Sequence, residues 1–197
     1  MINLAFLASN NGSSMRAILL AIEAGALKAR PVLAVSNRRT APALEFAEAH
    51  ATPTLFIPTV TDPEAADRRL AEALLAAGAE LVILSGYLRK LGPATLSAFA
   101  GRILNIHPAL LPKFGGAGMY GRRVHEAVIA AGEPVSGASV HLVDGEYDHG
   151  AVLACVEVPV LAADTPERLE ARVIAAEPAL LVGTLQRIAR GELDLPA

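Results

Sequence analysis

The sequence predicts an α/β fold with a single, mostly parallel, twisted sheet that has helices on both faces. Three observations support this prediction. Short apolar runs alternate with longer amphipathic stretches through the first half of the 197 residues. These runs are apolar throughout, which is typical of strands buried on both faces. The second half departs from this alternation and closes with one long amphipathic stretch. We therefore expect a Rossmann-like first half, followed by antiparallel strand(s) and a long closing helix.

Four strands and three helices are expected in the first half. Apolar runs place the strands at residues 2–8, 32–35, 54–57 and 80–86. The first helix has apolar residues at helical spacing from Met15 onward, and Gly25 lies where it should end. The other two helices are expected at residues 41–50 and, from the start signal Asp62-Pro63-Glu64, at 62–77.

The second half is expected to contribute three strands and two helices. The strands are placed at residues 102–107, 137–143 and 151–160, and the helices at 124–131 and 166–189. A glycine-rich loop, Lys113 to Arg123, follows the first of these strands. Nothing repeats and no low-complexity linker divides the chain, so residues 1–197 are interpreted as one domain.

Composition excludes several classes of protein. Hydrophobic residues make up 53% of the chain and charged residues 19%, which argues against disorder. The longest apolar runs hold about four to six residues, against roughly eighteen for a membrane span. A net charge of -3 provides no basic surface for nucleic acid. The lone Cys155 allows no disulfide framework and is interpreted as a small core residue. We expect a soluble, cytoplasmic protein.

The turn after the first strand is a candidate phosphate site. Asn11, Gly12, Ser13 and Ser14 lie between a strand and a helix, where main-chain N–H groups and hydroxyls can hold a phosphate. Ser13 or Ser14 would equally serve as a helix N-cap. No G-x-G-x-x-G motif is present and no acidic residue follows the second strand. A terminal phosphate is therefore favoured over a dinucleotide.

Asn105 and His107 form the most informative pair. They lie two residues apart at the carboxyl end of a strand, so both side chains face the same way at the edge where open α/β sheets bind ligands. An asparagine can orient a carbonyl or oxyanion, and a histidine can donate a proton. His141 either lines the same site or is a half-buried histidine. Taken alone, Asp148 is an ordinary turn aspartate.

Several segments together resemble the folate-dependent formyltransferases. They are the run Ile103–Pro112, with Asn-x-His-Pro followed by Leu-Leu-Pro, the turn at Asn11-Gly12-Ser13, the segment Leu84–Leu91, and Ser136–His141 with the Asp148 loop. All occur in the family's order, and the resemblance covers residues 3 to about 191. It implies a catalytic trio of Asn105, His107 and Asp148, with His141 as an auxiliary residue. The Leu111-Pro112 peptide bond is implied to be cis.

The resemblance also implies two substrate sites. Residues 1–100 would form a phosphate- and ribonucleotide-binding half, and residues 101–197 a catalytic and folate-binding half. The ribonucleotide would contact Asn11, Gly12, Ser13, Ser14 and Glu177. The folate would contact Leu88, Arg89, Lys90, Leu91, Asn105, Val143 and Asp144. With no Trp and three Tyr in the chain, we expect main-chain groups and aliphatic walls around Leu88, Leu91 and Val143 to hold the pteridine.

Three departures from the family pattern affect these assignments. Asn10 and Ser14 replace the first glycine and last asparagine of the phosphate turn. Pro63 stands where a basic residue often contacts the folate tail. The loop Lys113 to Arg123 is longer and richer in glycine than in many members, so its substrate contacts are not transferred.

The implied activity is transfer of a formyl group from 10-formyltetrahydrofolate to the amine of glycinamide ribonucleotide, in purine biosynthesis. The reaction requires no metal and no covalent intermediate, and its partners are small molecules, without nucleic acid or membrane. The oligomeric state stays open between monomer and homodimer. Alternatives are a formyltransferase acting on an amino sugar nucleotide or methionyl-tRNA, and a non-catalytic folate- or nucleotide-binding regulator on the same fold.

Overall fold

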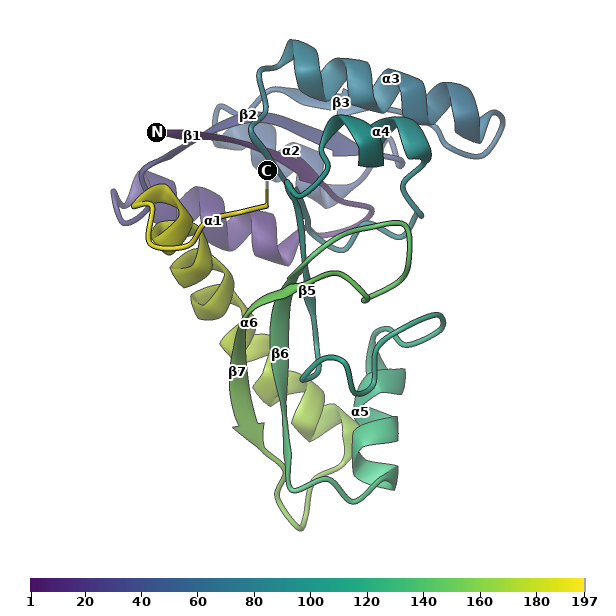
Figure 1. Cartoon of the computed structure of the whole chain (residues 1–197), viewed down its shortest axis with the longest axis vertical. Coiled ribbons are helices and arrows are strands. Elements are labelled where there is room, and N and C mark those ends of the chain that lie inside the picture. Colours follow the sequence, from purple (N-terminus) through teal and green to yellow (C-terminus); the bar gives the residue numbers. More distant parts are fainter. Residues whose placement is uncertain (197) are drawn as a thin grey trace.

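A seven-stranded sheet forms the centre of the structure, a computed structural model that describes residues 1–196 (Figure 1). The strands are β1 Ile2–Leu7, β2 Ala29–Ser36, β3 Thr54–Phe56, β4 Leu81–Leu84, β5 Ile103–His107, β6 Val135–Leu142 and β7 Val152–Pro159. They follow the spatial order β3-β2-β1-β4-β5-β6-β7. The strands β1 to β5 pair in parallel, whereas β6 runs antiparallel to β5 and β7 to β6. The predicted fold class is confirmed.

Helices cover both faces of this sheet. Among the described residues they are α1 Ser13–Glu23, α2 Pro42–Ala49, α3 Pro63–Ala76, α4 Pro93–Ala98, α5 Arg122–Ala130 and α6 Pro166–Ala189. The predicted closing helix has the bounds of α6, and the other predicted elements agree within about three residues. The sequence analysis does not predict α4, because six residues make fewer than two turns and show no helical repeat.

Each face of the sheet has its own apolar core. On one face, Leu4 and Phe6 of β1 pack with α1, α2 and the C-terminal half of α6. On the other face, Leu7 packs with Leu70 and Leu74 of α3 and with Phe99, which follows α4. Since β1 contributes to both cores, its run of apolar residues is explained by burial on two sides.

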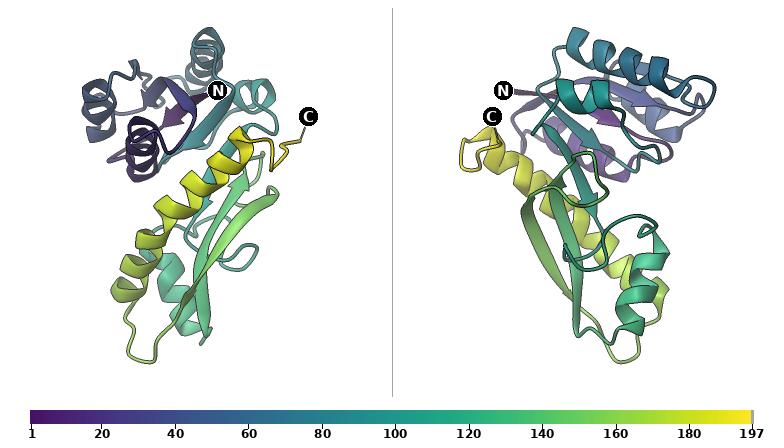
Figure 2. Two further views of the ribbon diagram at one scale, coloured as in Figure 1. Left: turned by 90° about the vertical axis from the view of Figure 1, so that its left-hand side faces the viewer. Right: turned by 45° about the vertical axis from the view of Figure 1, so that its right-hand side comes forward.

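The antiparallel strands extend beyond the parallel part of the sheet. Figure 2 shows the β6–β7 hairpin projecting away from the N-terminal half, with α6 running along it. A third apolar cluster fills this region, where Val128 of α5 and Ala138 of β6 pack against Leu169 and Val173 of α6. None of the helices among the described residues combines the length and the apolar character that a membrane crossing requires.

The expectation for Cys155 is wrong. Its side chain is exposed rather than buried in the core. The reason lies in the topology: β7 is the edge strand of the sheet, and only Val158 among its eight residues is fully buried. The apolar run therefore predicts the strand β7 correctly. It does not predict burial, because this strand has no neighbour on its outer side.

Candidate active site

The turn after β1 lies where the strand order reverses. β1 pairs with β2 on one side and β4 on the other, and such switch points form ligand-binding crevices in open α/β sheets. Gly12 is the N-cap of α1 and adopts a left-handed conformation (φ 63°), with no side-chain cap hydrogen bond. The expectation that Ser13 or Ser14 caps the helix is therefore wrong. A β-carbon at Gly12 would lie 3.0 Å from that of Ala43, so glycine permits both the turn and its close packing.

Hydrogen bonds join this turn to the segment after β4. The Ser85 hydroxyl accepts the N–H of Met15 in the first turn of α1, at 2.9 Å. The Ser9 hydroxyl accepts the N–H of Leu88, at 2.8 Å. Ser9 and Ser85 are each 1% exposed. The phosphate turn and the Leu88–Leu91 segment, which come from different strands, are thus held in one fixed arrangement.

His107 lies at the carboxyl end of β5 with its ring 3% exposed. Its Nε2 lies 2.8 Å from the carbonyl oxygen of Phe114. Because a carbonyl only accepts, this contact requires a hydrogen on Nε2. The other nitrogen, Nδ1, lies 3.4 Å from Oδ2 of Asp148. Nδ1 carries a hydrogen as well only when the ring is an imidazolium, so the pair forms an ion pair in that state.

Asp148 reaches this position from the loop between β6 and β7. Its main chain is left-handed (φ 56°), an uncommon conformation for a residue with a side chain. Oδ2 accepts the N–H of Gly116 at 3.0 Å, and Oδ1 lies 3.5 Å from Nε2 of His141. One carboxylate thus lies between two imidazole rings. The fold thus places Asp148, which local sequence alone does not distinguish from an ordinary turn aspartate, next to His107.

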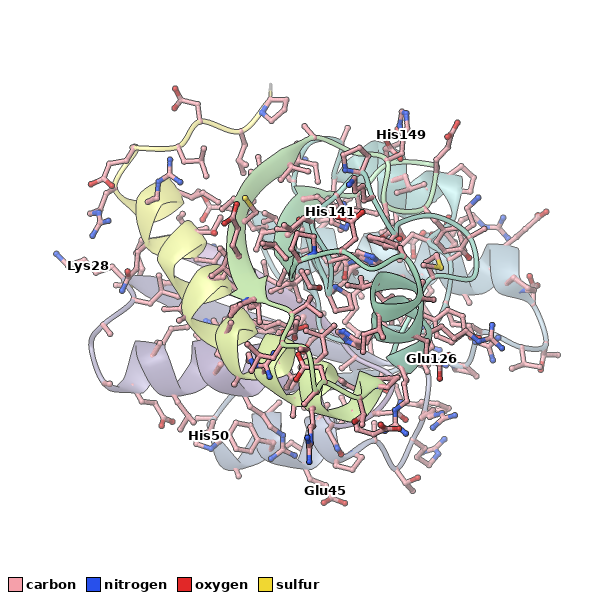
Figure 3. The ribbon with its side chains drawn as sticks, turned by 90° about the horizontal axis from the view of Figure 1, so that it is seen from below. Lys28, Glu45, His50, Glu126, His141 and His149 are labelled. Atoms are coloured by element: carbon pink, nitrogen blue, oxygen red, sulfur yellow. The ribbon has the colours of Figure 1, made fainter. Side chains whose placement is uncertain are left out.

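His141 and Asn105 complete the group. They lie opposite each other in the antiparallel register of β5 and β6, and Nδ2 of Asn105 lies 3.1 Å from Nε2 of His141. Figure 3 shows His141 well inside the outline of the molecule, whereas His50 and Glu45 lie at its periphery. We call Asn105, His107, His141 and Asp148 the strand-end cluster.

A cavity of about 110 Å³ opens beside the strand-end cluster. Its wall includes Asn105, His141 and Asp148 together with the predicted folate residues Arg89, Lys90, Leu91, Val143 and Asp144. A larger groove of about 730 Å³ lies between α3 and the segment after β4, and shares the wall residues Tyr87, Arg89, Lys90 and Leu91. The two hollows share these four wall residues and therefore adjoin.

The wall of the smaller cavity is not purely aliphatic, and which of its residues would contact a pteridine stays a prediction. Leu91 and Val143 line the smaller cavity, but Leu88 does not and is 59% exposed. Tyr87 and Tyr147 line it instead, and burial raises the pKa of the Tyr87 hydroxyl to about 12. The sequence analysis missed both tyrosines, although each adjoins a residue that it selected.

Asp144 also lies on this wall as an ionised carboxyl. Partial burial acts to raise its pKa, but hydrogen bonds from the N–H of Glu146, at 2.8 Å, and from His149 outweigh it and hold the pKa below the usual value. Among the described residues, no three His, Cys, Asp or Glu side chains converge as metal ligands would.

The structure does not bring every predicted residue to these hollows. Glu177 lies on α6, outside both walls and without a recorded hydrogen bond. Asn11 and Ser13 are exposed in the β1–α1 turn, whereas Gly12 and Ser14 are buried. Hydrogen bonds of Ser9 and Ser85 join the turn to the segment after β4. The β1–α1 turn is nevertheless not part of the wall of either hollow.

Burial raises the pKa of the Glu177 carboxyl to about 7. The folded protein therefore binds a proton more tightly there than the unfolded chain does, and the free energy of unfolding falls as the pH rises from about 4.5 to 7. We expect Glu177→Gln to remove this loss. Its stabilising effect should be about 1–2 kcal/mol greater at pH 8 than at pH 5, less than the full linkage value because the residue is not fully buried.

Urea denaturation at the two pH values measures this difference. Glu157→Gln, at an exposed site on β7, is the matched control and should show no such dependence. An equal effect of Glu177→Gln at both pH values would contradict the raised pKa.

A buried histidine, a carboxylate and an amide lie together at the carboxyl edge of this open α/β sheet, the edge at which sheets of this class bind small ligands. The sequence matches the family described as formyl transferase over residues 2–185. The chain therefore belongs to the formyl transferase family.

Individual relatives agree with this membership. The chain is 36% identical to phosphoribosylglycinamide formyltransferase of Escherichia coli over 195 residues, covering 98% of this chain and 90% of that one. It is 40% identical over 182 residues to the chloroplastic enzyme of the same name from Arabidopsis thaliana, and spans 91% of its own length but only 62% of that protein. The crystal structure of glycinamide ribonucleotide transformylase 1 from Symbiobacterium toebii superimposes with a TM-score of 0.90, at 34% identity, over 100% of this chain and 92% of the other.

Proposed function

We propose that this chain transfers the formyl group of 10-formyltetrahydrofolate to the amine of glycinamide ribonucleotide, a step of purine biosynthesis. The observation that carries the proposal is the contact of His107 with Asp148, at 3.4 Å, beside Asn105 and the cavity. The near full-length similarity to the Escherichia coli phosphoribosylglycinamide formyltransferase supports it. The expected substrates are small molecules, and we propose the cytoplasm as the compartment.

Attack of the amine on the formyl carbon creates an oxyanion and an ammonium in one tetrahedral species. We assign the Nε2–H of a protonated His107 as the donor to the oxyanion. In the structure this N–H is bonded to the Phe114 carbonyl, so the loop after β5 has to release it when the substrates bind. Such a donor contributes about 3–4 kcal/mol of transition-state stabilisation. Asn105 supplies a second polar group on the same side.

Asp148 has two roles in this scheme. As a carboxylate it stabilises the imidazolium of His107 across the 3.4 Å contact. It also accepts the proton of the new ammonium and returns it to the departing folate nitrogen, directly or through one water. The N–H of Gly116 holds the carboxylate in place for both.

The two substrates are assigned to the two parts of a single domain, residues 1–197. In residues 1–100, the N–H groups and hydroxyls of Asn11, Gly12, Ser13 and Ser14 hold the phosphate of the ribonucleotide. Glu177 joins them as the contact to its amine-bearing arm. In and around residues 101–197, the folate lies against Leu88, Arg89, Lys90, Leu91, Asn105, Val143 and Asp144.

A spectrophotometric assay with a 10-formyl folate analogue tests the proposal. Glycinamide ribonucleotide should act as the acceptor, and an amino sugar nucleotide supplied in parallel should not. Turnover only with the sugar nucleotide would identify the alternative transferase. Binding of both ligands without turnover would leave a regulator on the same fold. Sedimentation of the purified chain decides between monomer and homodimer.

A further inference from the structure

We infer that His141 is a positioning residue that determines which way the side-chain amide of Asn105 faces in the transfer site. Its consequence for catalysis rests on the proposed function, but the arrangement itself exists without substrate. His141 is 2% exposed and lies opposite Asn105 across the β5–β6 pair. It therefore contacts the amide with a ring that is almost fully buried.

A main-chain carbonyl determines which ring nitrogen of His141 carries the hydrogen. Nδ1 of His141 lies 2.8 Å from the carbonyl oxygen of Leu142. A carbonyl cannot donate, so Nδ1 carries the hydrogen. In a neutral ring the other nitrogen, Nε2, is then an acceptor only. The Leu142 carbonyl thus selects the tautomer of a ring whose other nitrogen faces the site.

The tautomer in turn selects the orientation of the amide. An Asn side chain presents nearly the same shape after a half-turn, so packing alone does not distinguish its oxygen from its nitrogen. At 3.1 Å from Asn105, an Nε2 that only accepts requires the NH₂ group as its neighbour. The amide oxygen is thereby directed away from His141. Both polar ends of Asn105 are fixed before any substrate arrives.

Charge on His141 would reverse this selection. A protonated Nε2 would donate to Oδ1 of Asp148, 3.5 Å away, or to an inverted Asn105 amide. Burial, the largest influence, and the positive charge of a protonated His107 lower the pKa of His141; the Leu142 carbonyl, Asp148 and Asp144 act in the opposite direction but do not outweigh them. The ring is therefore neutral at neutral pH, and the acceptor state prevails.

The expected catalytic consequence is pre-organisation of a donor. A transition-state donor is effective when it needs no reorientation during the reaction. With His141 as acceptor, Asn105 keeps one N–H on the ring and the second free. Loss of the acceptor allows the amide to turn, which should lower kcat while substrate affinity changes little.

A direct test reads the tautomer itself. Long-range ¹H–¹⁵N spectra of the full chain at pH 7.5 should show a protonated Nδ1 and an unprotonated Nε2 for His141, assigned by loss of the signals in His141→Gln. A hydrogen on Nε2, or a charged ring at this pH, would overturn the inference. The result is independent of turnover, so it also stands or falls separately from the proposed function.

Three variants test the consequence. His141→Gln places an amide near the Nε2 position, with an oxygen for Asn105 and an NH₂ for Asp148, and should keep kcat within about threefold of the parent. His141→Asn reaches only the Leu142 carbonyl, and His141→Leu neither partner. Both should lower kcat by about 10-fold or more, which is less than the loss expected when a transition-state donor is removed altogether. KM should stay within about threefold of the parent value.

The pattern among the variants separates positioning from packing. Circular dichroism first establishes that each variant is folded. Equal losses in His141→Gln and His141→Leu, or a loss confined to KM, would contradict a role through the Asn105 amide. If the parent chain itself transfers no formyl group, the proposed function fails, and the spectra alone then decide the tautomer.

Discussion

Replacement of His107 by alanine should lower kcat for formyl transfer by about 10²–10³-fold, the loss typical of removing one donor to an oxyanion. The ring is the one member of the strand-end cluster that has a hydrogen on Nε2 and a carboxylate at 3.4 Å from Nδ1. Its removal abolishes both the donor and the contact with Asp148. Steady-state kinetics with glycinamide ribonucleotide and a 10-formyl folate analogue measure the effect.

Controls for this variant address folding and specificity. His107 is nearly fully buried, so His107→Leu, which keeps much of the volume and has no group that can donate a hydrogen bond, is measured beside His107→Ala. Both variants should unfold in a cooperative thermal transition, and both should show a large loss of kcat. His50 follows the C-terminus of α2 and pairs with Glu23, away from the strand-end cluster. His50→Ala should therefore keep the parent kcat. An unchanged kcat in folded His107→Ala would remove this residue from the mechanism.

Gly150→Ala is expected to lower the free energy of unfolding by about 3 kcal/mol, the range of severe overpacking. A β-carbon at this position would overlap the main-chain carbonyl oxygen of Leu142. The strand cannot yield easily there, because the Leu142 N–H bonds to the Ala151 carbonyl at 2.9 Å. The displaced carbonyl is the one that holds Nδ1 of His141, so formyl transfer should fall as well.

Urea denaturation and kinetics on the same preparations test both parts. Gly145→Ala is the matched control in the same loop, because a β-carbon there meets nothing within 4 Å. It should change the free energy of unfolding by less than about 0.5 kcal/mol. A stable and fully active Gly150→Ala would show that the hairpin adjusts without moving Leu142.

Much of the fold is readable from the sequence because β1, β2 and β4 contribute buried residues to the apolar cores on both faces of the sheet. Burial of that kind requires uninterrupted apolar runs, and the intervening amphipathic stretches follow. Predictions from the sequence fail where the surroundings of a residue in the fold differ from those that its local sequence pattern suggests. Cys155 lies in an apolar run on an edge strand and is exposed. Gly12, not a serine, caps α1, since close packing against α2 leaves no room for a side chain.

The site divides in the same way. Asn105 and His107 are predictable because two polar residues at the carboxyl end of a strand have no place in a core. The Leu111-Pro112 bond, implied by family resemblance to be cis, is confirmed. The carbonyls of Phe114 and Leu142 and the N–H of Gly116 are not predictable, because main-chain groups leave no trace in residue identity. They hold His107, His141 and Asp148 in place, and only the folded loops reveal them.

The helix α6 belongs to both parts of the molecule. Its N-terminal turns pack through Leu169 and Val173 on the β6–β7 region. Its C-terminal turns pack through Leu181 and Leu185 on the core that contains β1 and α1. The apolar core of residues 1–100 on this face of the sheet is therefore completed by a helix from the other half of the chain. The chain should melt in a single transition, and a cut within α6 should disrupt both proposed ligand sites at once.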